Sequence, residues 1–164
     1  MKKSSLLTLA TAAAVIGTTA GTFAIWDTFD ASSETTITVT DDVKTVSVDT
    51  ELSLTAGTPV GTGDTATISY SGDVTFAIEG KTNNLKMELI PTVTSTDVAN
   101  LQENVDYTVE VKEGSGESGL TNLTDETLTA SNTYHVVVTV KNKRLAGKTL
   151  KVEMKAKASE KTSI

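Results

Sequence analysis

Polar and apolar residues alternate along most of the chain after residue 35. The run 36–40 reads Thr-Ile-Thr-Val-Thr, and the run 85–89 reads Leu-Lys-Met-Glu-Leu. Successive side chains of a strand point to opposite faces, so each run places an apolar face on a core and a polar face in water. On this basis we predict strands over 36–40, 45–48, 66–70, 74–78, 85–89, 107–111, 134–140 and 150–156.

Turn-forming residues separate these runs. Gly, Asn, Asp and Pro gather at 56–64, 71–73, 79–84 and 114–119, and these residue types favour tight turns and positive φ. Helix is expected only as one or two turns within 95–103, capped by Ser95 or Thr96, and as one turn within 124–128. Short, regularly spaced strands without long helices predict a single all-β domain: a sandwich, a jelly roll or a barrel.

The first 24 residues have a different character. Lys2 and Lys3 precede a charge-free, largely apolar run at 6–16, and small residues follow it. The run is shorter than the roughly 20 apolar residues that span a bilayer. This combination predicts a cleaved signal peptide over 1–24 rather than a permanent membrane anchor or a buried helix, and therefore export from the cell.

The small residues fix where the cut is expected. Thr22 and Ala24 occupy positions −3 and −1 of a cut before Ile25, and signal peptidases require small side chains at both positions. A cut after Ala20, with Thr18 at −3, is the alternative. Cleavage after Ala24 leaves 140 residues with 12 basic and 21 acidic side chains, a net charge of −9.

This composition excludes several classes of function. A strongly acidic chain is poorly suited to bind nucleic acid or anionic lipid, because both depend on Lys and Arg contacts with phosphate. The sequence contains no cysteine, so the domain is not a disulfide-stapled mini-protein. A chain of this length can instead bury an adequate hydrophobic core.

Catalytic and metal-binding patterns are weak. His135 is the only histidine, so a zinc site built on two histidines is excluded. Its side chain is expected on the polar face of its strand. A Ser-His-Asp triad would have no Gly-x-Ser-x-Gly turn beside it. The acidic pairs at 27/30 and 41/42 are interpreted as turn residues rather than as a glycosidase pair or a calcium site.

We therefore expect no enzyme activity, no metal and no cofactor. The glycine-rich stretch 57–63 lacks the lysine of a phosphate-binding loop and is predicted to be a turn. Asn122-Leu123-Thr124 is a possible N-glycosylation site, relevant only in a host that glycosylates.

Apolar side chains gather at the expected mature N-terminus. Ile25, Trp26 and Phe29 lie within five residues of each other, and Trp26 is the only tryptophan. Free termini are usually polar and disordered. An extended apolar terminus is therefore predicted to complete a sheet edge in a neighbouring molecule by strand addition, the alternative being that it packs on its own domain.

The junction Gly21-Thr22-Phe23-Ala24-Ile25-Trp26-Asp27-Thr28-Phe29 resembles the Gly-Thr-aromatic-Ala / Phe-x-Asp junction of the TasA and camelysin-like family. Those are exported proteins of Gram-positive bacteria, with related bundling-pilus subunits in archaea. The runs 134–140 and 147–156 are similar to the family's closing strand pair. The chain is shorter than a typical TasA, and Asp27 directly follows Trp26 where the family often has Phe-Ser-Asp or Phe-Asn-Asp.

The resemblance implies an antiparallel jelly-roll subunit that a dedicated signal peptidase releases and that assembles with its own copies into biofilm-matrix or surface filaments. The expected organisation is a signal peptide (1–24), a donor segment (25–34) that begins at Ile25 and includes Trp26 and Phe29, a jelly-roll domain (35–158) and a frayed tail (159–164). Camelysin-like members are described as proteases, but this sequence has no metal-binding motif to carry that activity. The alternative function is a monomeric cell-surface adhesion or glycan-binding sandwich.

Overall fold

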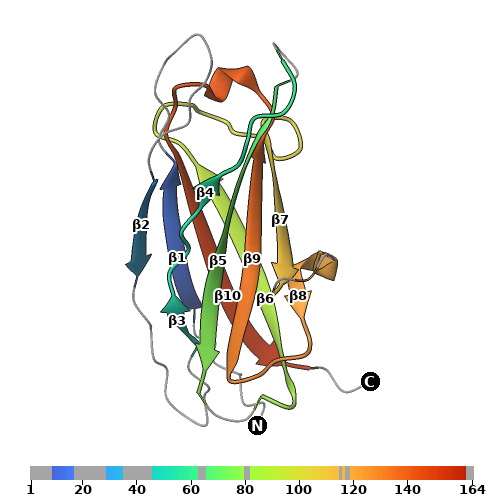
Figure 1. Ribbon diagram of the computed structural model, residues 1–164. Coiled ribbons are helices and arrows are strands. Elements are labelled where there is room, and N and C mark those ends of the chain that lie inside the picture. Colours follow the sequence, from blue (N-terminus) through green and yellow to red (C-terminus); the bar gives the residue numbers. More distant parts are fainter. Residues whose placement is uncertain are drawn as a thin grey trace.

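The chain folds as two antiparallel β-sheets packed face to face (Figure 1). The computed structural model describes residues 9–16, 29–34, 46–62, 66–79, 82–114, 116 and 119–161. The strands are β1 (Leu9–Ile16), β2 (Phe29–Glu34), β3 (Val46–Thr50), β4 (Thr55–Ala56), β5 (Ile68–Ile78), β6 (Leu85–Thr94), β7 (Tyr107–Glu113), β8 (Thr124–Asp125), β9 (Ser131–Val140) and β10 (Leu150–Glu160). Two short 3₁₀ turns, η2 (Thr121–Leu123) and η3 (Lys143–Leu145), complete the described elements.

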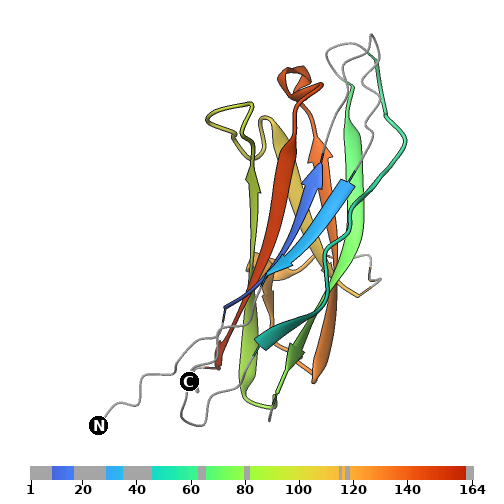
Figure 2. The same ribbon diagram turned by 90° about the vertical axis from the view of Figure 1, so that its left-hand side faces the viewer.

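The first sheet has the strand order β2-β1-β10-β6-β8, and the second has β3-β5-β9-β7 with β4 attached to β5. Each described ladder is antiparallel. The two layers are visible edge-on in Figure 2. The prediction of an all-β antiparallel sandwich is therefore confirmed.

Alternation along the strands builds the core between the sheets. In β9, Tyr134, Val136 and Val138 are fully buried, and the residues between them are exposed or half-buried. Phe76 of β5 packs against the Tyr134 ring, with centroids 6.2 Å apart. Each large apolar side chain buried in this way contributes about 1.5–3 kcal/mol, so the sandwich can hold together without disulfides.

Strand β5 corrects one prediction. The residues Ser71-Gly72-Asp73 were expected to form a turn between two strands, but β5 runs without interruption from Ile68 to Ile78. A Cβ atom at Gly72 would lie 1.9 Å from the carbonyl oxygen of Ser53. Glycine is therefore needed here because another backbone segment crosses the strand closely. Such a close approach is a common reason for glycine within a strand.

The two expected helical segments are also wrong. Residues 95–103 contain bends and no helix. The Ser95 hydroxyl donates to the Thr149 carbonyl (2.7 Å), and the Asp97 carboxylate accepts from the Thr149 N–H (2.8 Å). These bonds tie the loop to the start of β10. Thr124 and Asp125 form β8 and pair with β6, and the 3₁₀ turn lies just before them.

Several strands, among them β6 and β10, extend further than their patterns predicted. β6 continues through Pro91 to Thr94. Its neighbour β8 pairs only with Met87 and Glu88, so β8 does not extend alongside Pro91. Proline is tolerated on such an open side of a strand. β10 continues past residue 156 to Glu160, which pairs with Leu85 of β6. The predicted strand at 36–40 lies outside the described residues.

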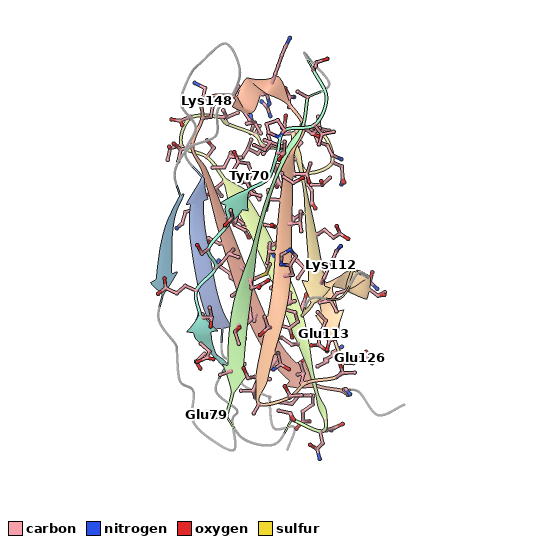
Figure 3. The ribbon with its side chains drawn as sticks, viewed as in Figure 1. Tyr70, Glu79, Lys112, Glu113, Glu126 and Lys148 are labelled. Carbon is pink, nitrogen blue, oxygen red and sulfur yellow. The ribbon has the colours of Figure 1, made fainter. Side chains whose placement is uncertain are left out.

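A buried carboxylate fixes the loops at one end of the sandwich. Asp106, 1% exposed, accepts hydrogen bonds from Arg144 Nε (2.7 Å), Asn142 Nδ2 (2.9 Å) and the Gln102 N–H (2.9 Å). The hydrogen bond from the Arg144 guanidinium is the main cause that lowers the pKa of Asp106 to about 2. The β6–β7 and β9–β10 loops are thereby joined at the end that carries Lys148, opposite the end that carries Glu79 (Figure 3).

The Gly72→Ala substitution tests the close backbone crossing. We expect it to lower the free energy of unfolding by about 1–3 kcal/mol, because the backbone at Ser53 must move to admit the methyl group. Gly119→Ala is the matched control, since the nearest atom to its Cβ would be the flexible Glu110 carboxylate at 3.6 Å. Urea unfolding followed by circular dichroism measures both, and equal stability of the two variants would contradict the crossing.

Acidification tests the Asp106 cluster. The folded-state pKa of Asp106 lies below its ordinary value of 3.8, so its stabilisation is complete above about pH 4 and is lost as the pH falls towards 2. The expected loss is about 2 kcal/mol. Asp106→Asn should lack this component in unfolding measurements between pH 5 and 2. Glu103→Gln, which removes an exposed acid of the same loop, should retain the wild-type pH profile.

Candidate functional site

The edge of β10 that faces β1 is the candidate site, because a segment predicted to be removed covers it. Leu9–Ile16 pairs with Leu150–Lys157 through eight consecutive antiparallel positions, and β2 pairs with the far side of β1. We call this side of Leu150–Lys157 the β10 edge. β1 also lies close to β3 of the second sheet, so it closes one side of the sandwich (Figures 1 and 2).

The β10 edge has an apolar row beneath it. Leu150, Val152, Met154 and Ala156 are all fully buried. Their partners across the ladder in β1 are Ile16, Ala14, Ala12 and Ala10. An unpaired edge above a buried apolar row would expose both backbone hydrogen-bonding groups and core surface to water. This edge therefore requires a strand beside it.

The residues between the buried positions carry charge. Lys151 Nζ lies 2.6 Å from Glu153 Oε1, and Lys155 Nζ lies 3.8 Å from Glu153 Oε2. The hydrogen bond from Lys151 is the main cause that lowers the pKa of Glu153. This outward-facing row reads Lys-Glu-Lys-Lys from residue 151 to Lys157; Lys151 is exposed and the other three are half-buried. The row therefore has a net positive charge.

This surplus is part of a wider separation of charge. Residues 141–161 hold eight of the 14 basic side chains of the chain but only two of its 21 acidic ones. The rest of the chain is correspondingly acidic. β10 and the loop before it are thus basic, whereas the rest of the same chain is acidic. Opposite charges on two parts of one chain favour contact between copies in a defined orientation.

The predicted N-terminal site residues are only partly described. Ala24, Ile25 and Trp26 lie outside the described residues. Phe29 is the first residue of β2 and pairs with Ile16 of β1. The structure therefore places part of the predicted donor segment one strand away from the β10 edge, but not beside it.

Sequence reasoning missed the β10 edge itself. The run 6–16 was interpreted only as a signal segment, because a nearly unbroken apolar run has no period-two alternation to mark a strand. The lysines of β10 were visible only as the polar half of an amphipathic strand. The available signal was the clustering of basic residues after residue 140 in an acidic chain.

His135 has the surface position that the sequence predicted. Its Nδ1 lies 2.6 Å from Asp73 Oδ1, and Lys112 of β7 is its register partner on the other side. The neighbouring hydroxyls of β5 and β9 bond to each other, as in the Ser69–Thr139 pair at 2.8 Å. This row is a solvated cross-strand network on the outer face of the second sheet.

The described residues include no group of three or more His, Cys, Asp or Glu side chains placed to hold a metal ion. The acidic positions 27, 41 and 42 lie outside the described part. Asn122 is exposed, with φ 51°, in η2, so the sequon is accessible. No helix among the described residues is long and apolar enough to cross a membrane.

Comparisons with protein-family models, with curated proteins and with solved structures find no match for this chain. Function must therefore be inferred from the sequence and the geometry of the β10 edge.

Removal of residues 1–24 should open the β10 edge. In an antiparallel ladder, alternate residues of a strand bond to each neighbour, so alternate amides of Leu150–Lys157 should lose roughly tenfold or more of their hydrogen-exchange protection. The amides bonded to β6 should keep theirs. The measurement compares the full chain with residues 25–164 by NMR at a concentration where both are monomeric.

The amides of β9 serve as the internal control, because both of its neighbours, β5 and β7, remain in place. Unchanged protection along β10 would show that residues 1–24 do not cover this edge in solution.

Proposed function

We propose that this protein is a secreted structural subunit that polymerises by donor-strand exchange into extracellular filaments. The domain is a jelly-roll-type sandwich, and a dedicated signal peptidase removes residues 1–24. The mature N-terminal segment of one subunit then occupies the β10 edge of the next. The filament serves as biofilm matrix or as a surface or bundling pilus, and the protein has no enzymatic role.

One observation carries the proposal: the strand that covers the β10 edge belongs to the predicted signal peptide. Export with cleavage after Ala24 would take β1 away from the fully buried row at Leu150, Val152 and Met154. The remaining domain would then have an open edge and, at its new N-terminus, an apolar segment without a partner. Strand addition between subunits satisfies both at once.

The geometry of such a contact explains polymerisation. The donor segment and the β10 edge are different surfaces of one subunit, so the contact is heterologous. A heterologous contact that does not close into a ring repeats indefinitely and produces a filament. The resemblance of residues 21–29 to the TasA and camelysin-like junction agrees with this mode of assembly.

Truncation of the N-terminus tests the proposal. We expect residues 25–164 to form filaments in negative-stain micrographs and to elute in the void volume of a size-exclusion column. A version that begins at Ser33 should remain monomeric, because it lacks Ile25, Trp26 and Phe29. The full chain, in which β1 covers the edge, is the matched control and should also remain monomeric.

If residues 25–164 stay folded and monomeric at high concentration, strand exchange is the wrong mechanism. The monomeric adhesion or glycan-binding sandwich would then be the better account, and a glycan array would be the next experiment.

A further inference from the structure

The described residues of the donor segment match the β10 edge in both charge and size. β1 lies between them and is uncharged throughout. Three register rows cross the three strands at the charged positions of β10: Asp30–Val15–Lys151, Ser32–Ala13–Glu153 and Glu34–Thr11–Lys155. Three rows cross at its buried positions: Phe29–Ile16–Leu150, Ala31–Ala14–Val152 and Ser33–Ala12–Met154.

The charged rows are complementary. The two acids of the segment share rows with Lys151 and Lys155, and the neutral Ser32 shares the row of Glu153. Directly opposite charges in neighbouring strands are favourable, whereas like charges are unfavourable. A strand 29–34 placed beside β10 would therefore add two ion pairs to the existing lysine–glutamate row without placing two acids together.

The buried rows are complementary as well. Phe29, Ala31 and Ser33 carry no charge. They can therefore lie beside the buried apolar row of β10 in the same sheet without burying an ion. The start of the mature chain fits less well, because Asp27 stands at the same alternate positions as Ile25 and Phe29 and would face the core with them. The match favours 29–34 over 25–28 as the strand that docks.

We propose that Phe29–Glu34 of a second copy of this chain occupies the β10 edge, with Lys151 and Lys155 as the residues that select it. This inference rests on the proposed function and assigns its contact. The second copy's strand runs antiparallel to β10, with Asp30 opposite Lys155, Ser32 opposite Glu153 and Glu34 opposite Lys151. Phe29 then stands opposite the small Ala156, and Ala31 takes the position that Ala12 of β1 holds opposite Met154.

Strand direction is the reason to assign a second copy. β2 is antiparallel to β1, and β1 is antiparallel to β10, so β2 of the same chain runs parallel to β10. A sideways shift of β2 within one chain would create a parallel ladder in a sandwich whose described ladders are all antiparallel. A strand from another molecule can enter in the antiparallel direction.

Both directions satisfy the charges, because Asp-x-Ser-x-Glu and Lys-x-Glu-x-Lys read alike from either end. They differ in which acid meets which lysine. The antiparallel strand of a second copy brings residue 30 to residue 155, and the shifted strand of the same chain brings residue 30 to residue 151. Cysteine pairs can distinguish these contacts, because the chain has no cysteine of its own.

The experiment uses the full chain with a protease site inserted between Ala24 and Ile25, so that cleavage starts assembly. Asp30→Cys chains are mixed with Lys155→Cys or Lys151→Cys chains that carry a larger tag, and they are oxidised after cleavage. We expect a disulfide between differently tagged chains for the 30–155 combination and little for 30–151, since opposed Cβ atoms in antiparallel strands approach the separation of a disulfide.

Charge reversal provides a second measurement. Lys151→Glu with Lys155→Glu should slow filament growth about five- to tenfold at low salt, and Asp30→Lys with Glu34→Lys in the donor should restore it. Lys112→Glu with Lys141→Glu is the matched control, because it makes the same change in net charge away from the β10 edge. The difference should shrink at 0.5 M salt. Thermal unfolding confirms that each variant folds.

The outcomes separate the two proposals. Filaments from the cleaved wild-type chain, without the 30–155 disulfide and without sensitivity to charge reversal, would overturn the assigned contact and leave strand exchange in place. In a separate chain that carries both Asp30→Cys and Lys151→Cys, a disulfide formed within single chains after cleavage would overturn the second copy as the occupant. No filaments from the cleaved wild-type chain would overturn the proposed function and this contact with it.

Discussion

The β10 edge is the constraint on which the rest of the molecule depends. A strand whose inner residues are fully buried must be paired on both sides, because its free N–H and C=O groups and the core below it would otherwise meet water. β6 satisfies one side through ten consecutive pairs. The other side depends on β1, which lies next to β2 and close to the second sheet. Whatever occupies that position decides whether the sandwich is closed.

The other described features keep this edge in a defined place. The Asp106 cluster joins the loops before β7 and before β10, so the start of β10 is fixed relative to the second sheet. Ser95 and Asp97 bond to the backbone at Thr149, immediately before β10. Gly72 admits the backbone that crosses β5. A rigid edge of this kind costs little further ordering when a strand docks, and preorganisation favours association.

The sequence predicted the class of fold because alternation reports directly on which face of a strand is buried. The sequence-based prediction failed where a residue's role depends on a contact with a distant segment of the chain. Gly72 resembled a turn residue, but its role depends on a contact with Ser53 that is distant in sequence. Residues 95–103 have a helix cap and helix-forming residues, yet Ser95 and Asp97 bond to Thr149, just before β10. Such contacts between distant segments leave no local periodicity to detect.

The candidate site was the hardest part to predict, because it is a relation between strands. Asp30, Glu34, Lys151 and Lys155 appear in the sequence only as ordinary polar positions of alternating segments. Their correspondence emerges when the ladders give the register across β1.

That correspondence also explains how a short strand with few large side chains could hold the β10 edge and still be replaced. β1 is joined covalently to the rest of the chain, so its effective concentration at the edge is high, in the millimolar range for short connections. The proposed cleavage would remove that advantage and leave an uncharged strand of mostly small residues to compete with one that offers a phenylalanine and two matched acids. The balance would then favour the incoming strand, and in the proposed assembly the proteolytic cut would be the step that permits polymerisation.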